Sequence, residues 1–272
     1  MTLLQAVLLG LIQGVTEFLP ISSSGHLVLA EHFLGVPPSA DVTFEIFVHF
    51  GTLVSVVVVF WKDIKKIVAA FFGALAHPRT FRTRYAESED LRIALFILIG
   101  SIPAAVVGLR FEDSISAAFE DPKLVSVMLI VTGLILYLTR LARPQEDKPM
   151  SMLSSILVGC AQAVAIIPGI SRSGATISTA MYLRVSPVRA ARFSFLLALP
   201  VIAGGTLLHT KDLLTEGGGV ESLLTVGLGT VTAFLSGYLA IRFLLRLVEK
   251  GKFSVFSVYC LIAGTLGILF IG

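Results

Sequence analysis

The sequence predicts an all-α polytopic membrane protein, with six transmembrane helices and two re-entrant helical hairpins arranged as an inverted-topology repeat. Three observations support this prediction. Of the 272 residues, 55% are hydrophobic and only 14% are charged, whereas a soluble domain usually carries about a quarter charged residues. Long apolar stretches recur along the chain, and its two halves align at one constant offset.

Six apolar stretches are long enough to cross a bilayer, which takes about 20 mainly apolar residues per helix. The mean hydropathy of +0.90 agrees with a chain that is largely embedded in lipid. We therefore expect transmembrane helices at residues 42–61, 91–111, 124–142, 193–209, 222–246 and 254–272. Cys160 and Cys260 lie in apolar runs and are expected to be small buried hydrophobic residues.

Two further apolar regions, residues 1–35 and 153–183, are broken in the middle by Pro, Gly and Ser, in the sequences LPISSSGH and IPGISRSGAT. Pro and Gly are the least favourable residues inside a helix, and neither half of either region is long enough to span alone. Each region is therefore predicted to form a helical hairpin that turns near the midplane. Irregular backbone at that depth requires a protein-lined or polar cavity.

The loop charges predict an orientation, because cytoplasmic loops are enriched in Lys and Arg. Residues 62–90 contain six basic residues, and the loops that follow residues 142, 183 and 246 are basic as well, whereas residues 112–123 are mainly acidic. In this topology the first hairpin enters from the outer face and the second from the cytoplasmic face. A net charge of +3 is too small to indicate a nucleic-acid partner.

A shift of 149 residues aligns the two hairpins without a gap. The matched pairs include Gly10 and Gly159, Gln13 and Gln162, Ser22 and Ser171, Ser24 and Ser173, and Gly25 and Gly174. We therefore expect a first repeat at residues 1–150 and a second at 151–272, each with one hairpin and three spans. An odd number of spans inverts the second repeat, so that two broken helices meet near the midplane and build a site.

The positions where the repeats differ are the candidates for chemistry. Glu17 is matched by Ile166, Ser23 by Arg172 and His26 by Ala175, so the first hairpin has an acid, a hydroxyl and an imidazole where the second has a guanidinium. If the tips meet, these four polar groups converge in one cavity. Glu45 and His49, four residues apart in the first span, either complete this cavity or pair with each other.

Arg172 is expected to bind phosphate, because a guanidinium deep in a membrane segment usually marks a functional site. It lies at the expected start of a helix, where backbone N–H groups, hydroxyls and a planar cation suit an anion. The further phosphate contacts are expected from Ser171, Ser173, Gly174, Thr176 and Ser24. The alternatives are an Arg172 side chain that extends to the cytoplasmic surface, or a structural ion pair with Glu17.

Glu17 and Gln13 share a helix face at a spacing of four residues. The Glu17 carboxylate suits a divalent cation, held together with phosphate oxygens, or a general base. Ser23 and His26 suit a nucleophile and its activating base, or His26 is itself the nucleophile. The alternative for the serines is a helix cap, the commoner role of a Ser-rich turn.

These residues resemble the signatures of a known family. QGVTEFLPISSSGH and PGISRSGAT are similar to the two signature motifs of the undecaprenyl pyrophosphate phosphatases, the bacitracin-resistance phosphatases, and the likeness extends over essentially the whole chain, including FEIFVHFGTL and RFSFLLALP. The first acidic position of the first motif is Gln13 here. This weakens any mechanism that needs two carboxylates and leaves Glu17 as the metal ligand or base.

The resemblance implies hydrolysis of undecaprenyl diphosphate to undecaprenyl phosphate and inorganic phosphate. It also implies Mg²⁺ or Ca²⁺ as cofactor, bacitracin resistance, and catalytic roles for Glu17, Ser23, His26 and Arg172. The expected location is the bacterial cytoplasmic (inner) membrane, with a site that opens to the outer, periplasmic side. The partners implied are a polyprenyl diphosphate and membrane lipid, and a homodimer is left open.

A transporter is the main alternative, because inverted repeats with paired broken helices are also a transporter plan. A carrier of the lipid phosphate between leaflets would need Arg172 but neither a nucleophile nor a base. A purely structural membrane subunit would leave the buried charges unexplained. The residues alone do not decide between Ser23 and His26 as the nucleophile.

Overall fold

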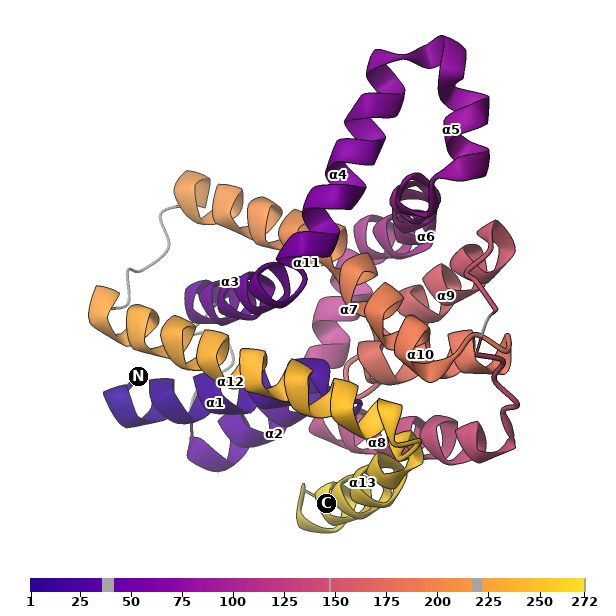
Figure 1. Ribbon diagram of the computed structural model, residues 1–272. Coiled ribbons are helices and arrows are strands. Elements are labelled where there is room, and N and C mark those ends of the chain that lie inside the picture. Colours follow the sequence, from indigo (N-terminus) through magenta and orange to yellow (C-terminus); the bar gives the residue numbers. More distant parts are fainter. Residues whose placement is uncertain (36–41, 147, 217–221, 272) are drawn as a thin grey trace.

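The computed structural model describes residues 1–35, 42–146, 148–216 and 222–271, and this part of the chain is helical throughout apart from short connections and one isolated bridge between Gln145 and Val185. In chain order the α-helices are α1 (Leu3–Phe18), α2 (Ser23–Leu34), α3 (Val42–Val59), α4 (Trp61–Ala76), α5 (Phe81–Glu87), α6 (Glu89–Arg110), α7 (Glu112–Phe119), α8 (Pro122–Leu138), α9 (Met152–Val164), α10 (Arg172–Tyr182), α11 (Pro187–Glu216), α12 (Leu223–Glu249) and α13 (Phe256–Ile271). Short 3-10 helices are η2 (Pro78–Thr80), η3 (Thr139–Leu141) and η4 (Phe253–Val255). The all-α fold class is confirmed (Figure 1).

Within the described residues, five helical stretches are long and apolar enough to cross a membrane, as judged by length and composition. They are Glu89–Arg110, Pro122–Leu141, Pro187–Leu207, Leu223–Glu249 and Phe253–Phe270. They confirm the spans predicted at 91–111, 124–142, 193–209, 222–246 and 254–272, with boundaries that differ by a few residues. The chain is therefore a polytopic membrane protein.

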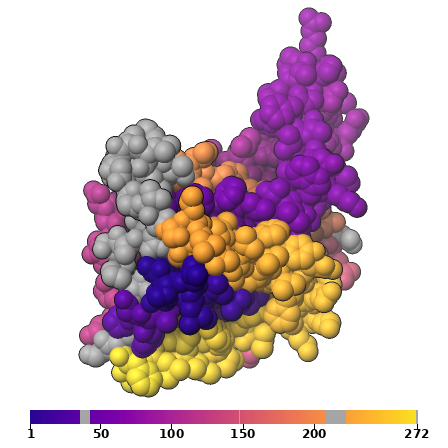
Figure 2. Space-filling model, turned by 90° about the vertical axis from the view of Figure 1, so that its left-hand side faces the viewer, coloured from indigo at the N-terminus to yellow at the C-terminus, as the bar shows by residue number. Residues whose placement is uncertain are grey.

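The span predicted at residues 42–61 corresponds to α3, and the chain bends directly after this helix. α3 ends at Val59, α4 begins at Trp61, and the two are bent by 82° at this break, so only the bent pair qualifies as a sixth candidate span. The segment that follows, expected as a loop, is helical: α4 and α5 project from the rest of the molecule (Figures 1 and 2). Asp63 of α4 pairs with Arg192 of α11 at 2.6 Å and ties the base of this projection to the helix bundle.

Both apolar regions with central Pro, Gly and Ser are broken where the sequence predicts. α1 and α2 are separated by four residues and α9 and α10 by seven, and the two helices of each pair pack against each other. Each second helix begins with a serine cap: Ser22 Oγ accepts from Gly25 N at 3.2 Å, and Ser171 Oγ accepts from Gly174 N at 3.0 Å. These caps satisfy backbone donors that would otherwise be unpaired in a buried position.

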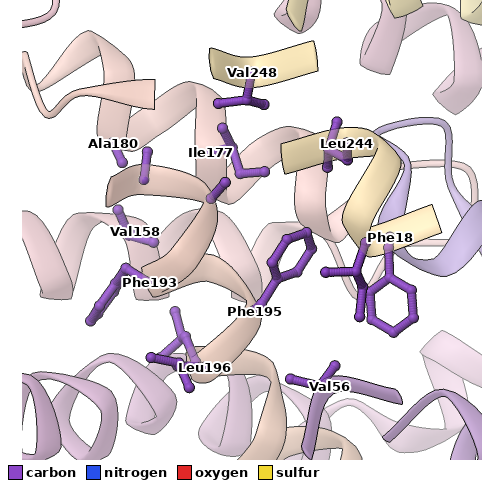
Figure 3. Close-up of a cluster of buried hydrophobic side chains, with 14 of the residues drawn as sticks. Phe18, Val56, Val158, Ile177, Ala180, Phe193, Phe195, Leu196, Leu244 and Val248 are labelled. Carbon is purple, nitrogen blue, oxygen red and sulfur yellow. The ribbon is translucent and has the colours of Figure 1, made fainter. Parts of the chain in front are cut away.

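Beside the two breaks lies a hydrophobic core (Figure 3). Phe18, at the end of α1, packs edge-on against Phe195 of α11, with ring centroids 5.7 Å apart, and both side chains are fully buried. This contact fixes the end of α1, and therefore the position of Glu17, against α11. Cys260 is buried as expected, but Cys160 is exposed on α9, so the expectation for Cys160 is wrong.

Candidate active site

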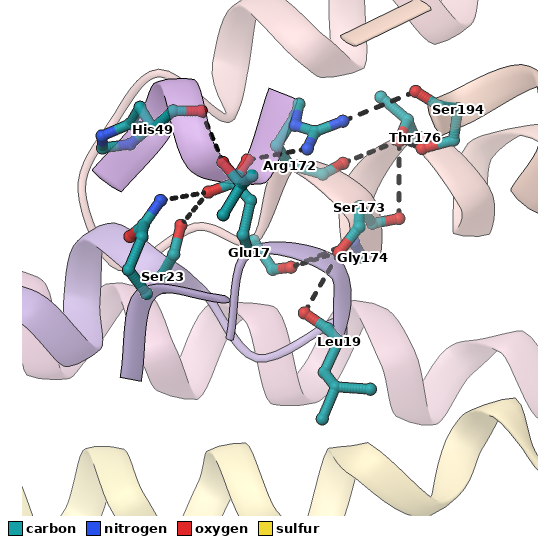
Figure 4. Close-up of polar contacts among 12 residues, drawn as sticks. Glu17, Leu19, Ser23, His49, Arg172, Ser173, Gly174, Thr176 and Ser194 are labelled. Carbon is teal, nitrogen blue, oxygen red and sulfur yellow. Dashed lines mark hydrogen bonds and ion pairs between the residues drawn. The ribbon is translucent and has the colours of Figure 1, made fainter. Parts of the chain in front are cut away.

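The two hairpins meet at an ion pair. Glu17, in the last turn of α1, is 8% exposed, and its Oε1 accepts a hydrogen bond from Arg172 Nη2 at 2.8 Å. The other carboxylate oxygen, Oε2, accepts from Ser23 Oγ at 2.5 Å and from Gln13 Nε2 at 3.1 Å (Figure 4). The structure thus brings together three of the four predicted catalytic residues, together with Gln13.

Arg172 is the first residue of α10, and its side chain is 14% exposed. Besides Glu17, it contacts the backbone oxygen of Ser194 in α11, at 3.5 Å from Nη1. The alternative in which Arg172 extends to the cytoplasmic surface is therefore wrong, and the ion pair with Glu17 is present. A guanidinium has five N–H donors, so this pair leaves donors for an anion.

A buried ion pair is weak evidence for stability, because desolvation of both charges offsets most of the attraction between them. The chemistry of the Glu17 cluster, here Glu17 with Gln13, Ser23 and Arg172, is more informative. A hydroxyl donates to a carboxylate that is itself held by a cation. This arrangement can deprotonate a nucleophile and neutralise an anionic substrate at one place.

His26 makes its contacts elsewhere. Its Nδ1 lies 2.8 Å from the backbone oxygen of Ser22, and its Nε2 lies 2.7 Å from the hydroxyl oxygen of Tyr259 in α13. Ser23 and His26 are three residues apart in α2 and so share one face of that helix. His26 therefore stands about one turn from the Glu17 cluster, with its ring held by a residue that the sequence did not single out.

The hydroxyls of the expected phosphate cradle are engaged with the protein. Ser171 Oγ caps α10, Ser173 Oγ donates to the backbone oxygen of Leu19 at 3.2 Å, and Thr176 Oγ1 lies 2.6 Å from Ser194 Oγ. In the first hairpin, Ser24 Oγ lies 3.2 Å from Ser22 Oγ. What remains available for an anion at this point is the guanidinium and the positive end of α10. The direct phosphate contacts predicted for these hydroxyls stay predictions.

A divalent cation fits the donors beside Glu17. Gln13 is fully buried, and its Oε1 has no hydrogen-bond partner. A carboxylate and an amide oxygen are ligand types that Mg²⁺ and Ca²⁺ prefer, and Mg²⁺ in phosphate chemistry is commonly held by one or two carboxylates plus substrate oxygens. Among the described residues no group of three His, Cys, Asp or Glu side chains gathers in one place, so substrate oxygens would have to complete such a site.

Glu45 and His49 both lie on α3. His49 Nδ1 bonds to the backbone oxygen of Glu45 at 2.8 Å, within α3. His49 lies near Glu17, and the two groups interact electrostatically (Figure 4). This position agrees with the alternative in which α3 adds a polar group beside Glu17.

Three residues of the site were missed by sequence reasoning. Thr132 of α8 bridges the second break: its Oγ1 donates to Gly169 O at 2.9 Å and accepts from Ser171 N at 3.0 Å. Ser194 orients Arg172, and Tyr259 holds His26. Each is a polar residue within an apolar span, and this is the one signal in the sequence that could have singled them out.

Comparison with known proteins identifies the family of this chain. The family described as "Bacitracin resistance protein BacA" matches residues 6–266. A protein of Salinibacter ruber named "Undecaprenyl-diphosphatase" is 47% identical over 98% of this chain and 99% of its own length. Proteins of the same name from Desulforapulum autotrophicum and Halothermothrix orenii are each 42% identical, over 99% and 100% of this chain and 98% and 99% of their own lengths. The chain belongs to the BacA family.

Proposed function

We propose that the chain hydrolyses undecaprenyl diphosphate to undecaprenyl phosphate and inorganic phosphate, which recycles the lipid carrier of cell-wall synthesis and confers resistance to bacitracin. The single observation that carries this function is the Glu17 cluster, in which a hydroxyl, a carboxylate and a guanidinium meet inside a membrane protein of the BacA family. A carrier of lipid phosphate would need the guanidinium alone, so the Ser23–Glu17 hydrogen bond favours the hydrolase.

The inverted repeat that builds this site is part of the proposal, and reciprocal helix contacts support it. α1 packs on α12 and α9 packs on α6, while α8 packs on α13 and α3 on α11. In the proposed repeat α1 corresponds to α9, α3 to α11, α6 to α12 and α8 to α13. Exchange of corresponding helices converts the α1–α12 contact into the α9–α6 contact and leaves the α8–α13 and α3–α11 contacts unchanged. This is the pattern that a two-fold axis in the membrane plane produces. The two hairpins would then be re-entrant, entering from opposite faces.

Matched residues also make matched contacts. Gly10 lies against the backbone of Gly229 at the α1–α12 crossing, and its counterpart Gly159 lies against the backbone of Gly100 at the α9–α6 crossing. At the tips, the backbone oxygen of Gly169 accepts from Thr132 of α8. Its counterpart at the first tip is the Pro20 oxygen, which contacts Cys260 Sγ of α13 at 3.6 Å. Equivalent positions in the two repeats therefore have equivalent neighbours.

We place the protein in the bacterial cytoplasmic membrane, with the site open to the outer side. The basic residues of the α4–α5 projection and of the segments after residues 142, 183 and 246 support this orientation, because Lys and Arg are retained in cytoplasmic loops. The diphosphate would approach the Glu17 cluster from the outer side while the prenyl chain stays in lipid.

The hydrogen bond between Ser23 and Glu17 supports a two-step mechanism with Ser23 as nucleophile. Glu17 takes the proton of Ser23 Oγ, which attacks the terminal phosphorus; the bond from that phosphorus to the bridging oxygen breaks, and undecaprenyl phosphate leaves with the electron pair. Water then attacks the phosphoserine and releases inorganic phosphate, while Glu17 returns its proton to Ser23. Arg172 and the first backbone N–H groups of α10 neutralise the charge on the phosphate oxygens throughout.

Glu17 and Gln13 Oε1 are the protein ligands that we assign to Mg²⁺ or Ca²⁺. When bound, the cation supplies charge neutralisation for the diphosphate oxygens. Gln13 would contribute an oxygen without a second negative charge, so the negative charge that holds the cation would come mainly from Glu17 and the substrate. This predicts weak cation binding in the absence of substrate.

The test is phosphate release from undecaprenyl diphosphate by the purified full chain in detergent, with Mg²⁺, with Ca²⁺ and with EDTA. We expect release that EDTA abolishes and that either cation restores. A folded wild-type protein that releases no phosphate under any of these conditions would overturn the hydrolase and leave the transporter as the better account. Release that persists in EDTA would overturn the cation site alone.

A single-turnover experiment with a labelled terminal phosphate separates the two nucleophiles. A phosphoserine survives acid and is cleaved by alkali, whereas a phosphohistidine is cleaved by acid. We expect acid-stable label on the protein that is absent from Ser23→Ala. Acid-labile label, retained in Ser23→Ala and lost in His26→Ala, would contradict the mechanism and assign His26 as the nucleophile.

A further inference from the structure

The contact between His26 and Tyr259 joins two helices that lie far apart in the sequence. Besides the 2.7 Å hydrogen bond, the two rings are stacked, with centroids 5.5 Å apart and an interplanar angle of 14°. The hydrogen bond and the stack together fix both the position and the rotation of the imidazole. Nothing in the mechanism described above requires this contact.

The hydrogen bonds of His26 define where its proton lies. Nδ1 faces the backbone oxygen of Ser22, which can only accept, so Nδ1 carries the proton. In the neutral imidazole the lone pair is then on Nε2, and the Tyr259 hydroxyl donates to it. His26 is thus held as the Nδ1–H tautomer with a proton acceptor at Nε2.

We propose that Tyr259 belongs to the active site: it positions His26 and connects the Nε2 lone pair of His26, the general base of the second step, to the attacking water. This inference rests on the proposed function and deepens it. In that step a water O–H bond breaks: its proton passes to the Tyr259 hydroxyl oxygen while the Tyr259 hydroxyl proton passes to His26 Nε2, and His26 later gives that proton up to solvent. The water oxygen bonds to phosphorus, the bond from phosphorus to Ser23 Oγ breaks, and inorganic phosphate leaves.

The location of Tyr259 suits this role. Tyr259 is 47% exposed on α13, so a water molecule can reach its hydroxyl and donate to the phenol oxygen while the hydroxyl proton stays directed at His26 Nε2. Ser23 lies one helical turn from His26, so a phosphoryl group on Ser23 Oγ would be within reach of water held beside this pair. Tyr259 therefore acts through His26 and has no direct contact with the phosphorus.

The test is Tyr259→Phe, which keeps the ring and removes the hydroxyl. Tyr182→Phe is the matched control, because the Tyr182 hydroxyl donates to a backbone oxygen, that of Ile135, at 2.6 Å, and the Tyr182 side chain is 42% exposed. We expect Tyr259→Phe to lower kcat by about tenfold with KM changed by less than about twofold, since general base catalysis contributes about 10²–10⁴-fold in total. Tyr182→Phe should keep kcat within about twofold of wild type. Equal effects of the two substitutions would overturn the proposal.

A double mutant tests whether Tyr259 acts through His26. In a His26→Ala background, Tyr259→Phe should change the residual rate by less than about twofold, because the residue that it positions is gone. A further tenfold loss in that background would show that Tyr259 acts independently of His26, which contradicts the assigned role.

A readout that needs no activity separates this inference from the proposed function. In full-length protein labelled with ¹⁵N-histidine, we expect one imidazole with the shifts of an Nδ1–H tautomer, absent from His26→Ala. Tyr259→Phe should move its Nε2 resonance, and Tyr182→Phe should not. A wild type with this signature but without phosphatase activity would overturn the function and leave the contact intact. A His26 resonance that is identical in wild type and Tyr259→Phe would overturn the inference itself.

Discussion

At the tip of the first hairpin, Ser22 caps α2 through Gly25 N and lies 3.2 Å from Ser24 Oγ. At the tip of the second, Ser171 caps α10 through Gly174 N and lies 3.2 Å from Ser173 Oγ. Each tip has the same three residues, two serines and a glycine, at the same spacing. Around these shared contacts the side chains differ: the first hairpin presents Glu17, Ser23 and His26, and the second presents Arg172.

This difference shows how one site can be built from two hairpin tips of similar backbone structure but different side chains. The cap serines and glycines turn each chain inside the protein, where unpaired backbone groups are costly. The positions that differ supply opposite charges, and the charges meet only because the tips do. A site of this kind has no complete motif on either hairpin.

The tips also differ in backbone strain. Ser22 has a φ of 70°, in a region that a residue with a side chain rarely adopts, whereas the second tip places its positive φ of 90° at Gly169. Such a conformation at a non-glycine residue costs about 1–3 kcal/mol and tends to occur at functional sites. At Ser22 it directs a backbone oxygen at His26 Nδ1, and the second tip, which has Ala175 at the matching position, has no imidazole to orient.

The largest effect is expected from removal of the cation of the second tip. Arg172→Ala should lower kcat/KM by about 10³-fold or more, because it removes the main donor for the phosphate oxygens and leaves Glu17 buried without its partner. Arg172→Lys keeps the positive charge but lacks the planar guanidinium with its paired N–H donors. It should therefore recover only part of the lost kcat/KM. Phosphate release by folded variants measures this. Activity of Arg172→Ala within tenfold of wild type would show that the second tip takes no part in the chemistry.

Ser23→Ala should lower kcat by about 10²–10³-fold with little change in KM, since a nucleophile acts in the chemical step. Ser257→Ala is the control: Ser257 is fully buried, but its hydroxyl donates to the backbone oxygen of Ser254, near its own position in the chain. Its kcat should stay within about threefold of wild type. If both substitutions reduce kcat equally, the loss reflects packing, and Ser23 has no special role.

The matched glycines test whether the two halves are built alike. Gly10→Ala and Gly159→Ala should each destabilise the protein by about 1–3 kcal/mol, because a Cβ at either position would collide with the backbone of the crossing helix. Gly227→Ala, where a Cβ has open space, should be neutral or slightly stabilising. Thermal unfolding in detergent compares the three. A loss at only one of the matched positions would break the reciprocity of the two crossings.

At the contacts that hold the tips from the side, we expect an effect like that of the glycines at Thr132 and the smallest effect at Cys260. Thr132→Val should cost about 1–3 kcal/mol, since it leaves buried backbone groups of Gly169 and Ser171 unpaired. Cys260→Ala should cost less, because a thiol is a weak donor. Thr265→Val, which removes a hydroxyl bonded within its own helix, is the control. A larger loss from Cys260→Ala than from Thr132→Val would reverse the expected order.

Much of the fold was accessible from the sequence, because apolar length and central Pro, Gly and Ser carry direct physical consequences in a membrane. The bend at Phe60 was not, since residues 59–62 contain neither Pro nor Gly and the apolar run continues to Trp61. In that region Asp63 pairs with Arg192, about 130 residues further along the chain, and α4 packs against α6, and neither contact can be seen in the local sequence.

The candidate site, like the fold, could be predicted from the sequence only in part. The meeting of Glu17 with Arg172 was predicted as one alternative, because two buried charges of opposite sign need partners. The roles of Thr132, Ser194 and Tyr259 were not predicted. In the sequence each is an ordinary polar residue in an apolar helix, and only the tertiary packing brings it to the site. A single sequence contains no local pattern that ranks such residues.

The measurement that tests the central claim most directly is a double-mutant cycle on phosphate release, with Glu17→Gln, Arg172→Ala and both together. If the two tips form one site, the double variant should lose about as much kcat/KM as the more severe single variant, because residues that act as a unit are strongly non-additive. Losses that multiply would show that Glu17 and Arg172 act independently, which would contradict a single site built from both hairpins.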